Sequence, residues 1–256
     1  MTPSTKSNLW CQELFQGTHL SKIEELFLGY CRRCVKHLKF CLLLSLVVSV
    51  TGCGGSQTIP DWTYTAFDKL EAYKQASLAE KTAVAELHFQ SAIAEVKKSG
   101  DLVLLARIHL THYAVQTALL ESFDDGEFLK IQAVQSDRSN EAFYAFLKGN
   151  FRREDITFLP PQYVVAVKDI LDGRKSSLAD DLRGISDPLS RLVMTGRLVL
   201  SGYEDETMLL SAQETASRQG WKKALLVYLN RLGVYYENRR EFEKAKKIKE
   251  KIRLIQ

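Results

Sequence analysis

The sequence beyond residue 53 contains no cysteine. The chain's five cysteines all lie at or before that position: Cys11, Cys31, Cys34, Cys41 and Cys53. The last two hundred residues can therefore form neither disulfide bonds nor a cysteine-ligated metal site. They must be stabilised by a hydrophobic core, and about 200 residues are enough to bury one as a single domain.

Neither sign of charge is in clear excess. The chain has 35 Lys and Arg against 31 Asp and Glu. The 52 residues before Cys53 hold six of the basic and three of the acidic residues, which leaves 29 and 28 for the remainder. A nearly neutral domain lacks the basic surface that phosphate backbones require, so we expect no nucleic-acid partner.

Motifs of known chemistry are also missing after residue 53. There is no G-x-S-x-G, no H-E-x-x-H and no P-loop, so the sequence predicts neither an enzyme nor a cofactor. No run alternates apolar and polar residues over strand length, which excludes an extended sheet. The sequence thus predicts an all-α domain over residues 61–256.

One stretch before this domain has a clear pattern. Lys36 and Lys39 precede an apolar run of 11 residues, 40–50, which ends in Thr51-Gly52-Cys53. The run is too short for a membrane-spanning helix, which needs about 20 residues. A basic flank, a short apolar run and small residues before a cleavage point are the layout of a secretory signal.

Residues 35–52 together with Cys53 resemble a bacterial lipoprotein signal peptide and its lipobox. The resemblance implies that the Cys53 thiol receives a lipid, that a peptidase cleaves after Gly52, and that Cys53 becomes the acylated first residue. Residues 53–60 would then be a lipidated tether with a span of about 15 Å. In such lipoproteins an Asp after the cysteine retains the protein in the inner membrane, and Gly54 instead favours the outer membrane, facing the periplasm.

The segment 1–34 is too long for an ordinary signal leader. One interpretation is that translation begins at Val35, so that residues 1–34 are not made. Another is that Cys31-Arg32-Arg33-Cys34 is a redox or zinc motif, since C-x-x-C brings two thiolates to one metal.

Helical periodicity and the positions of Gly, Pro and capping residues divide the domain into helices. Ser77-Leu78-Ala79-Glu80 reads as a capping box that separates the first two. The segment 151–159 has no clear period and is expected to be a loop. The predicted helices are 63–75, 78–98, 102–122, 127–135, 141–147, 162–171, 178–182, 189–200, 206–218, 221–237 and 240–255.

The last two predicted helices resemble a tetratricopeptide repeat. The residues at the family's apolar, small and aromatic positions are Leu229, Leu232, Gly233, Tyr236, Phe242 and Ala245. Gly196 and Ala216 fall near small-residue positions of a preceding pair, although Gly196 and Gly233 are 37 residues apart, against the family's 34. The family's terminal proline is missing, and Lys249 stands at a usually aromatic position. The resemblance implies antiparallel helical hairpins stacked as an array.

Three histidines are the candidate metal ligands. An antiparallel hairpin folded at Ser99 and Gly100 brings residue 88 level with about 111, and His109 and His112 share one helix face. His88, His109 and His112 could then bind one zinc ion. The alternative is that His112, within an apolar stripe, is a hydrogen-bonded packing residue.

Two further features have two interpretations each. Trp221, Tyr228 and Tyr235 recur at steps of seven beside Tyr236, and this cluster is either core or a peptide-binding groove. The basic segment 244–253 is either a solvated helix face or a surface for lipid headgroups or an acidic partner.

The sequence therefore predicts an exported, lipid-anchored protein whose helical domain binds other proteins of the cell envelope. The alternatives are an envelope enzyme or metal-binding protein that uses His88, His109 and His112, and a structural or chaperone-like periplasmic protein. The sequence does not indicate an oligomeric state.

Overall fold

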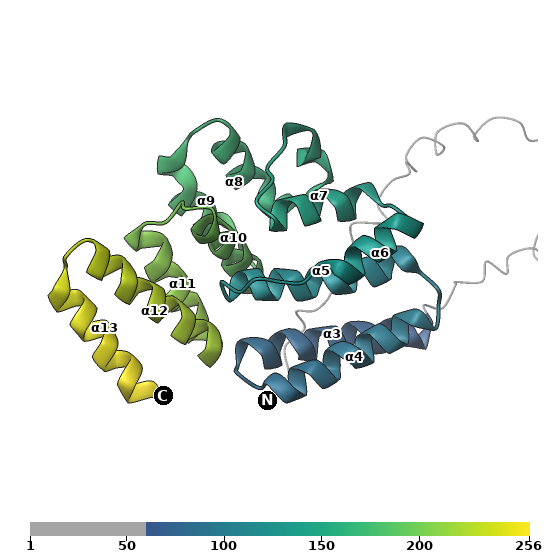
Figure 1. The fold of residues 1–256 in the computed structure, drawn as a ribbon, viewed down its shortest axis with the longest axis horizontal. Coiled ribbons are helices and arrows are strands. Elements are labelled where there is room, and N and C mark those ends of the chain that lie inside the picture. Colours follow the sequence, from purple (N-terminus) through teal and green to yellow (C-terminus); the bar gives the residue numbers. More distant parts are fainter. Residues whose placement is uncertain (1–59) are drawn as a thin grey trace, which may run out of the picture. The chain divides into compact units, whose positions relative to one another are not determined.

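The computed structural model describes residues 60–256, and these residues are helical without a strand (Figure 1). The predicted all-α class is confirmed. The lipobox with Gly52 and Cys53, the start at Val35 and the Cys31–Cys34 motif lie outside the described residues. The elements are α3 (Asp61–Leu78), α4 (Thr82–Lys97), α5 (Leu102–Ala118), α6 (Gly126–Val134), α7 (Arg138–Leu147), η1 (Arg153–Phe158), α8 (Pro161–Leu171), η2 (Lys175–Ser177), α9 (Leu178–Gly184), α10 (Pro188–Leu200), α11 (Glu206–Gln219), α12 (Lys222–Asn238) and α13 (Phe242–Ile255).

Aspartate caps begin four of these helices. Asp187 precedes Pro188, and its carboxylate accepts a hydrogen bond from the Ser190 backbone N–H at 2.7 Å. An acidic N-cap satisfies an otherwise unpaired amide and lies at the positive end of the helix dipole. Asp101, Asp137 and Asp205 cap α5, α7 and α11 in the same way.

The predicted capping box at Ser77 is wrong. α3 continues to Leu78, because that side chain is fully buried in the core. Glu80 then adopts a left-handed conformation with φ of 70°, and the Lys81 N–H bonds the Ala76 carbonyl to close the helix. The same non-glycine ending recurs at Leu120, which stops α5 earlier than predicted, and at Arg240 between α12 and α13.

The segment predicted as a loop at 151–159 contains the 3₁₀-helix η1. Its turn brings Asp155 into the protein, where its side chain binds two arginines. Six residues of 3₁₀-helix produce no 3.6-residue periodicity, which is why the sequence pattern did not reveal it.

Neighbouring helices pack as hairpins, as α3 does with α4, α11 with α12, and α12 with α13. The central contact is different, because α5 packs on α10, which is distant in the sequence. α5 also contacts α3, α4, α6 and α7, and it is buried on most of its circumference. The helices of segment 126–184 lie outside this hairpin arrangement, and the chain rejoins it at α10 (Figure 1).

The contact between α5 and α10 is very close. A Cβ built on Gly196 would lie 2.1 Å from the Thr117 carbonyl oxygen, so only glycine fits there. The Tyr228 hydroxyl from α12 lies 3.0 Å from the Ala118 carbonyl oxygen and 3.2 Å from the Leu192 carbonyl oxygen, and its single proton is shared between these two acceptors. One buried tyrosine therefore joins α5, α10 and α12.

The aromatic cluster of α12 is mainly core. Trp221, Tyr228 and Tyr236 are buried, and only Tyr235 is half-buried. The Trp221 Nε1–H donates to the Gln75 side chain at 2.8 Å, which links the start of α12 to α3. The core interpretation is confirmed, and the alternative of a peptide groove on this face is not supported.

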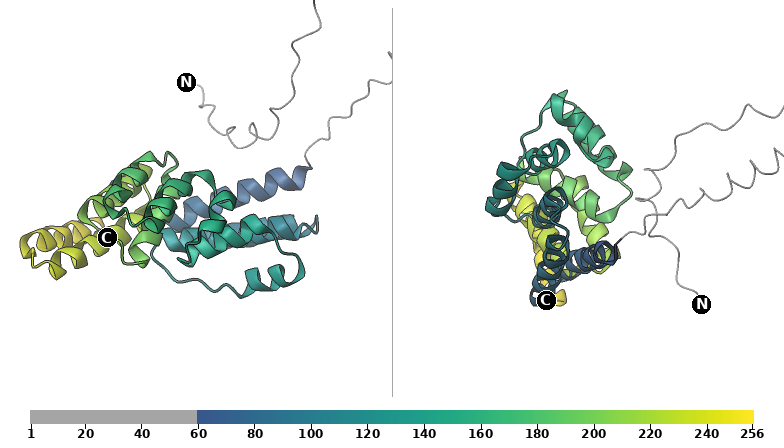
Figure 2. Two further views of the ribbon diagram at one scale, coloured as in Figure 1. Left: turned by 90° about the horizontal axis from the view of Figure 1, so that it is seen from above. Right: turned by 90° about the vertical axis from the view of Figure 1, so that its right-hand side faces the viewer.

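The last hairpin is packed less completely than the sequence predicts. Leu229, Leu232 and Ala245 are buried between α12 and α13, as the resemblance implies. Phe242, however, is 65% exposed. α13 has its extensive contact with α12 alone among the described elements, and it lies at one end of them (Figure 2). Of the apolar residues at helical spacing along α13, Ala245 is therefore buried, whereas Ile248, Ile252 and Ile255 are only half-buried.

Candidate functional site

The predicted histidine cluster is a packing cluster. The Tyr73 hydroxyl lies 2.7 Å from His112 Nδ1, and the Phe89 ring stacks on the His112 ring with centroids 4.4 Å apart. The same phenylalanine meets His109 edge-on at 5.8 Å. Burial lowers the pKa of both histidines, so both imidazoles are neutral at pH 7.

His88 does not join this cluster. The predicted level along the helices is correct, because position 89 of α4 meets positions 109 and 112 of α5. The side chain that faces α5 there belongs to Phe89, and one residue along a helix is a rotation of about 100°. No group of three His, Cys, Asp or Glu side chains within residues 60–256 could hold a metal ion. The three imidazoles therefore do not converge on one site.

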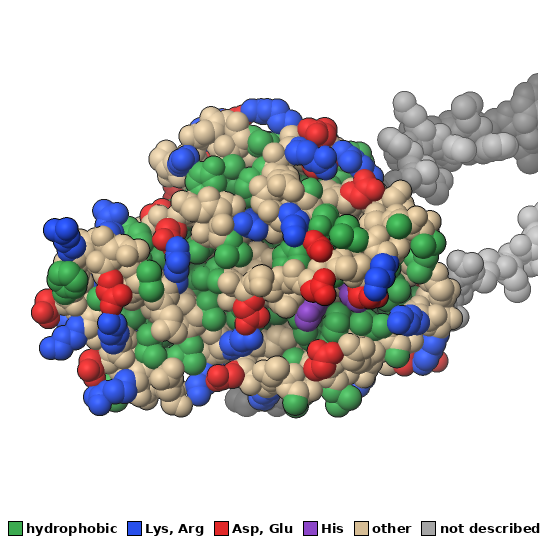
Figure 3. Space-filling model, viewed as in Figure 1, with side chains coloured by type: hydrophobic (Ala, Val, Ile, Leu, Met, Phe, Trp, Pro, Cys, Tyr) green, Lys and Arg blue, Asp and Glu red, His purple; other side chains and the backbone are tan. Residues whose placement is uncertain are grey.

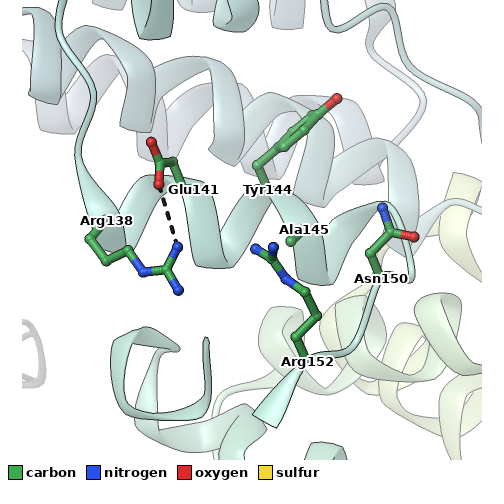
Figure 4. Close-up of a pocket in the computed structure, with 6 residues that line it drawn as sticks. All are labelled: Arg138, Glu141, Tyr144, Ala145, Asn150 and Arg152. Atoms are coloured by element: carbon green, nitrogen blue, oxygen red, sulfur yellow. Dashed lines mark ion pairs between the residues drawn. The ribbon is translucent and has the colours of Figure 1, made fainter. Parts of the chain in front are cut away.

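A pocket of about 440 Å³ lies beside α7. Four of its lining residues come from α7, namely Arg138, Glu141, Tyr144 and Ala145, and the following loop adds Asn150 and Arg152. Figure 4 shows the guanidinium of Arg152 reaching toward α7. It also shows Arg138 and Glu141 together at the other end of the pocket.

A buried carboxylate positions both arginines. Asp155 is 2% exposed; its Oδ1 accepts from Arg138 Nη2 at 2.7 Å and its Oδ2 from Arg152 Nε at 2.6 Å. A buried charge needs such partners, because removing it from water alone is very costly. Each pairing uses one edge of a guanidinium and leaves other N–H groups to face the pocket.

The remaining lining residues differ in chemistry. Glu141 Oε2 is 3.6 Å from Arg138 Nη1, so a negative charge lies at one rim. The Tyr144 hydroxyl donates to Asp125 at 2.6 Å, and burial together with this carboxylate raises the pKa of Tyr144 to about 12. The neutral tyrosine ring, Ala145 and the methylene stems of the arginines make most of the exposed surface of the pocket apolar.

Sequence reasoning missed this pocket. Arg138 and Asp155 are 17 residues apart, and the segment that joins them was expected to end in a loop. The only local signal is the run Arg152-Arg153-Glu154-Asp155, in which paired arginines precede paired acids inside an otherwise apolar segment. Such a run usually marks a solvated surface.

A second charged cluster lies where α8, η2 and α9 meet. Asp169 accepts hydrogen bonds from Arg174 and Ser177, and the Arg174 bond lowers the pKa of this carboxyl. Asp181 faces it, and its Oδ2 has no hydrogen-bond partner. Burial, followed by the charge of Asp169, raises the pKa of Asp181.

Large apolar side chains are exposed at the terminal hairpin. Phe242 and Leu254 of α13 are 65% and 79% exposed, and Lys246 and Lys247 beside them are also exposed. Over the face that Figure 3 shows, positive and negative side chains are interspersed without a large area of one sign. In the described part of the chain, no helix combines the length and the apolar character that crossing a membrane requires.

Comparison of the chain with protein-family models, with curated proteins and with solved structures finds no match.

Proposed function

We propose that the protein is exported, anchored to the membrane by a lipid on Cys53, and binds other proteins of the cell envelope through its helical domain. The anchor is supported by the order of residues in 35–53, where a basic flank, a short apolar run and Thr51-Gly52-Cys53 stand in register. The residue after the cysteine, Gly54, favours the periplasmic face of the outer membrane.

The protein-binding role is supported by one observation above the others, the two large apolar side chains that α13 exposes. Stacked hairpins bury their apolar faces against the next unit, and a terminal helix normally has a polar outer face. α13 has such a polar face, rich in Lys and Glu, but it also exposes Phe242 near its start and Leu254 near its end, about 120° apart around the helix. Aromatic side chains are enriched in protein interfaces, which favours Phe242 as the central contact residue.

The anchor is tested by growing cells with labelled palmitate. We expect label in the wild-type protein and none in Cys53→Ala, which should also keep its signal segment. An unlabelled wild-type protein, or a mature protein that retains residues before Cys53, would contradict the anchor.

The binding role is tested by placing a photo-crosslinking amino acid at Phe242 or Leu254 in living cells. We expect one discrete adduct of higher mass from each position. The matched control is Lys168 on α8, which is equally open to solvent but polar, and it should give no adduct. Phe242→Ser together with Leu254→Ser should abolish capture at a crosslinker placed on Lys246, with no loss of thermal stability, because both side chains are exposed. Unchanged capture would remove α13 from the interface.

A further inference from the structure

The pocket beside α7 has the donor groups of an anion site. Arg152 uses its Nε for Asp155, and neither of its Nη groups has a hydrogen-bond partner within residues 60–256. The Asn150 side chain also makes no hydrogen bond within residues 60–256. The residue is positioned by its backbone N–H, which donates to the Ala145 carbonyl. Figure 4 shows the Arg152 guanidinium between Arg138 and Asn150, with Asn150 at the end of the pocket opposite Glu141.

These donors are positioned before any ligand binds. The buried side chain of Asp155 accepts hydrogen bonds from both guanidinium groups and so fixes their positions. The end of α7 is fixed as well, because Arg197 of α10 donates to the Leu147 carbonyl at 2.7 Å. A pre-organised donor set loses less conformational entropy on binding than flexible surface lysines would.

We propose that this pocket binds a carboxylate group, held by the two Nη groups of Arg152 and by the Asn150 amide. A guanidinium presents two parallel N–H groups that match the two oxygens of a carboxylate. A singly charged group fits better than a phosphate, because Asp155, Glu141 and Glu154, the last at 3.9 Å from Arg152 Nε, already offset the two arginines and would repel a dianion. Ala145 and the Tyr144 ring provide apolar contact for the methylene groups of the ligand.

The carboxylate can come from two sources. One is a small free acid, and the other is a Glu or Asp side chain of a bound protein. Only the second source rests on the protein-binding function proposed above. The pocket volume of about 440 Å³ exceeds that of a carboxylate alone, so residues beside an acidic side chain would fit as well.

The test is a titration of the full chain in detergent micelles with N-acetyl-glutamate N-methylamide, followed through the NMR signals of the Asn150 side-chain amide and the Arg152 Nε–H. We expect saturable shifts with this probe and none with the glutamine analogue, which has the same shape without the charge. Equal shifts with both probes would overturn the proposal.

Three variants sharpen the result. Glu141→Gln removes the repelling charge, and a pair of this kind is worth about 0.5–1 kcal/mol, so binding should tighten about three-fold. Asn150→Ala removes a donor whose side chain has no structural bond, and binding should weaken about five-fold at unchanged stability. Arg153→Gln is the matched control, because this exposed arginine pairs with Asp172 and does not line the pocket. A loss of binding in the control equal to that in Asn150→Ala would show general charge attraction and contradict the site.

The sources are separated by propionate. Binding of propionate as tight as that of the blocked glutamate assigns the site to a free acid, and much tighter binding of the glutamate probe assigns it to a protein side chain. Either result supports a carboxylate site. If neither probe binds while the α13 crosslinks still form, the carboxylate site is disproved and the proposed protein-binding function is not affected.

Discussion

Replacing Gly196 by alanine should separate the two helices at the centre of the domain. The added Cβ would lie 2.1 Å from the Thr117 carbonyl oxygen and 3.2 Å from the Ala118 Cα. Real Cβ atoms essentially never approach a neighbouring atom closer than 3.0 Å, so α5 and α10 must separate by about 1 Å there. The obstacle is backbone, which cannot rotate aside as a side chain could.

The cost of this separation has two parts. Overpacking of a well-packed core costs about 1–3 kcal/mol. The movement also stretches the hydrogen bond that the single Tyr228 hydroxyl proton shares between the Ala118 and Leu192 carbonyls, which is worth about 1 kcal/mol. Alanine recovers about 1 kcal/mol through its higher helix propensity. We therefore expect Gly196→Ala to lower the free energy of unfolding by about 2 kcal/mol and Tm by about 4–8 °C.

The matched control is Gly233→Ala, which makes the same change inside a packed helix. Its Cβ would lie 3.6 Å from Ile248 Cγ2, an ordinary contact. This variant should be more stable than the wild type by about 0.5–1 kcal/mol. Urea unfolding, followed by circular dichroism and by the fluorescence of buried Trp221, measures both. Equal stability of the two variants would refute the close contact between α5 and α10.

Three further outcomes follow from the turns and the charged groups. Arg240→Gly relieves a left-handed residue with φ of 61° and should add about 1 kcal/mol in urea unfolding, whereas Gly220→Ala, at φ of 68°, should remove a similar amount. Burial lowers the pKa of His112 from 6.5, so the folded state binds fewer protons than the unfolded chain, and stability falls as the pH drops through that value. His112→Gln should therefore give a shallower fall in Tm between pH 7 and pH 5. The pKa of Asp181 is raised, so its stabilising contribution is present at low pH and lost as the pH rises. Asp181→Asn should therefore raise Tm at pH 7, and the gain should disappear on acidification; a constant gain at all pH values would exclude the ionisation of this buried carboxylate beside Asp169 as its cause.

Local signals predicted the helices well and their partners poorly. The predicted helix 189–200 differs from α10 by one residue, because its start depends on the capping side chain of Asp187 and on Pro188, which act within one turn. The contact of α10 with α5 could not be predicted in the same way, since the helices come together only after the segment 126–184 has left and returned. The close approach of two helices at Gly196 cannot be read from the sequence, in which this glycine is one small residue among others.

The candidate sites show the same limit. The sequence predicted correctly that α4 and α5 meet near residues 88 and 111. The residue of α4 that faces α5 there is Phe89 and not His88. A shift of one residue along the helix therefore decides between a metal site and a packed aromatic ring. The carboxylate pocket depends on Asp155 reaching Arg138 and Arg152 through a 3₁₀ turn, which has no sequence period of its own. The lipid anchor at Cys53 remains a prediction.

α12 contacts α3, and Trp221 donates a hydrogen bond to Gln75 at this contact. This contact distinguishes the domain from an open array of repeats. In an open array each unit contacts only its neighbours, so units can be deleted or unfolded one at a time. Here α3, near the start of the domain, packs against α12, near its end. Cutting the chain between α5 and α10 should therefore not yield two independently folded halves, and heating should melt the whole domain in one transition.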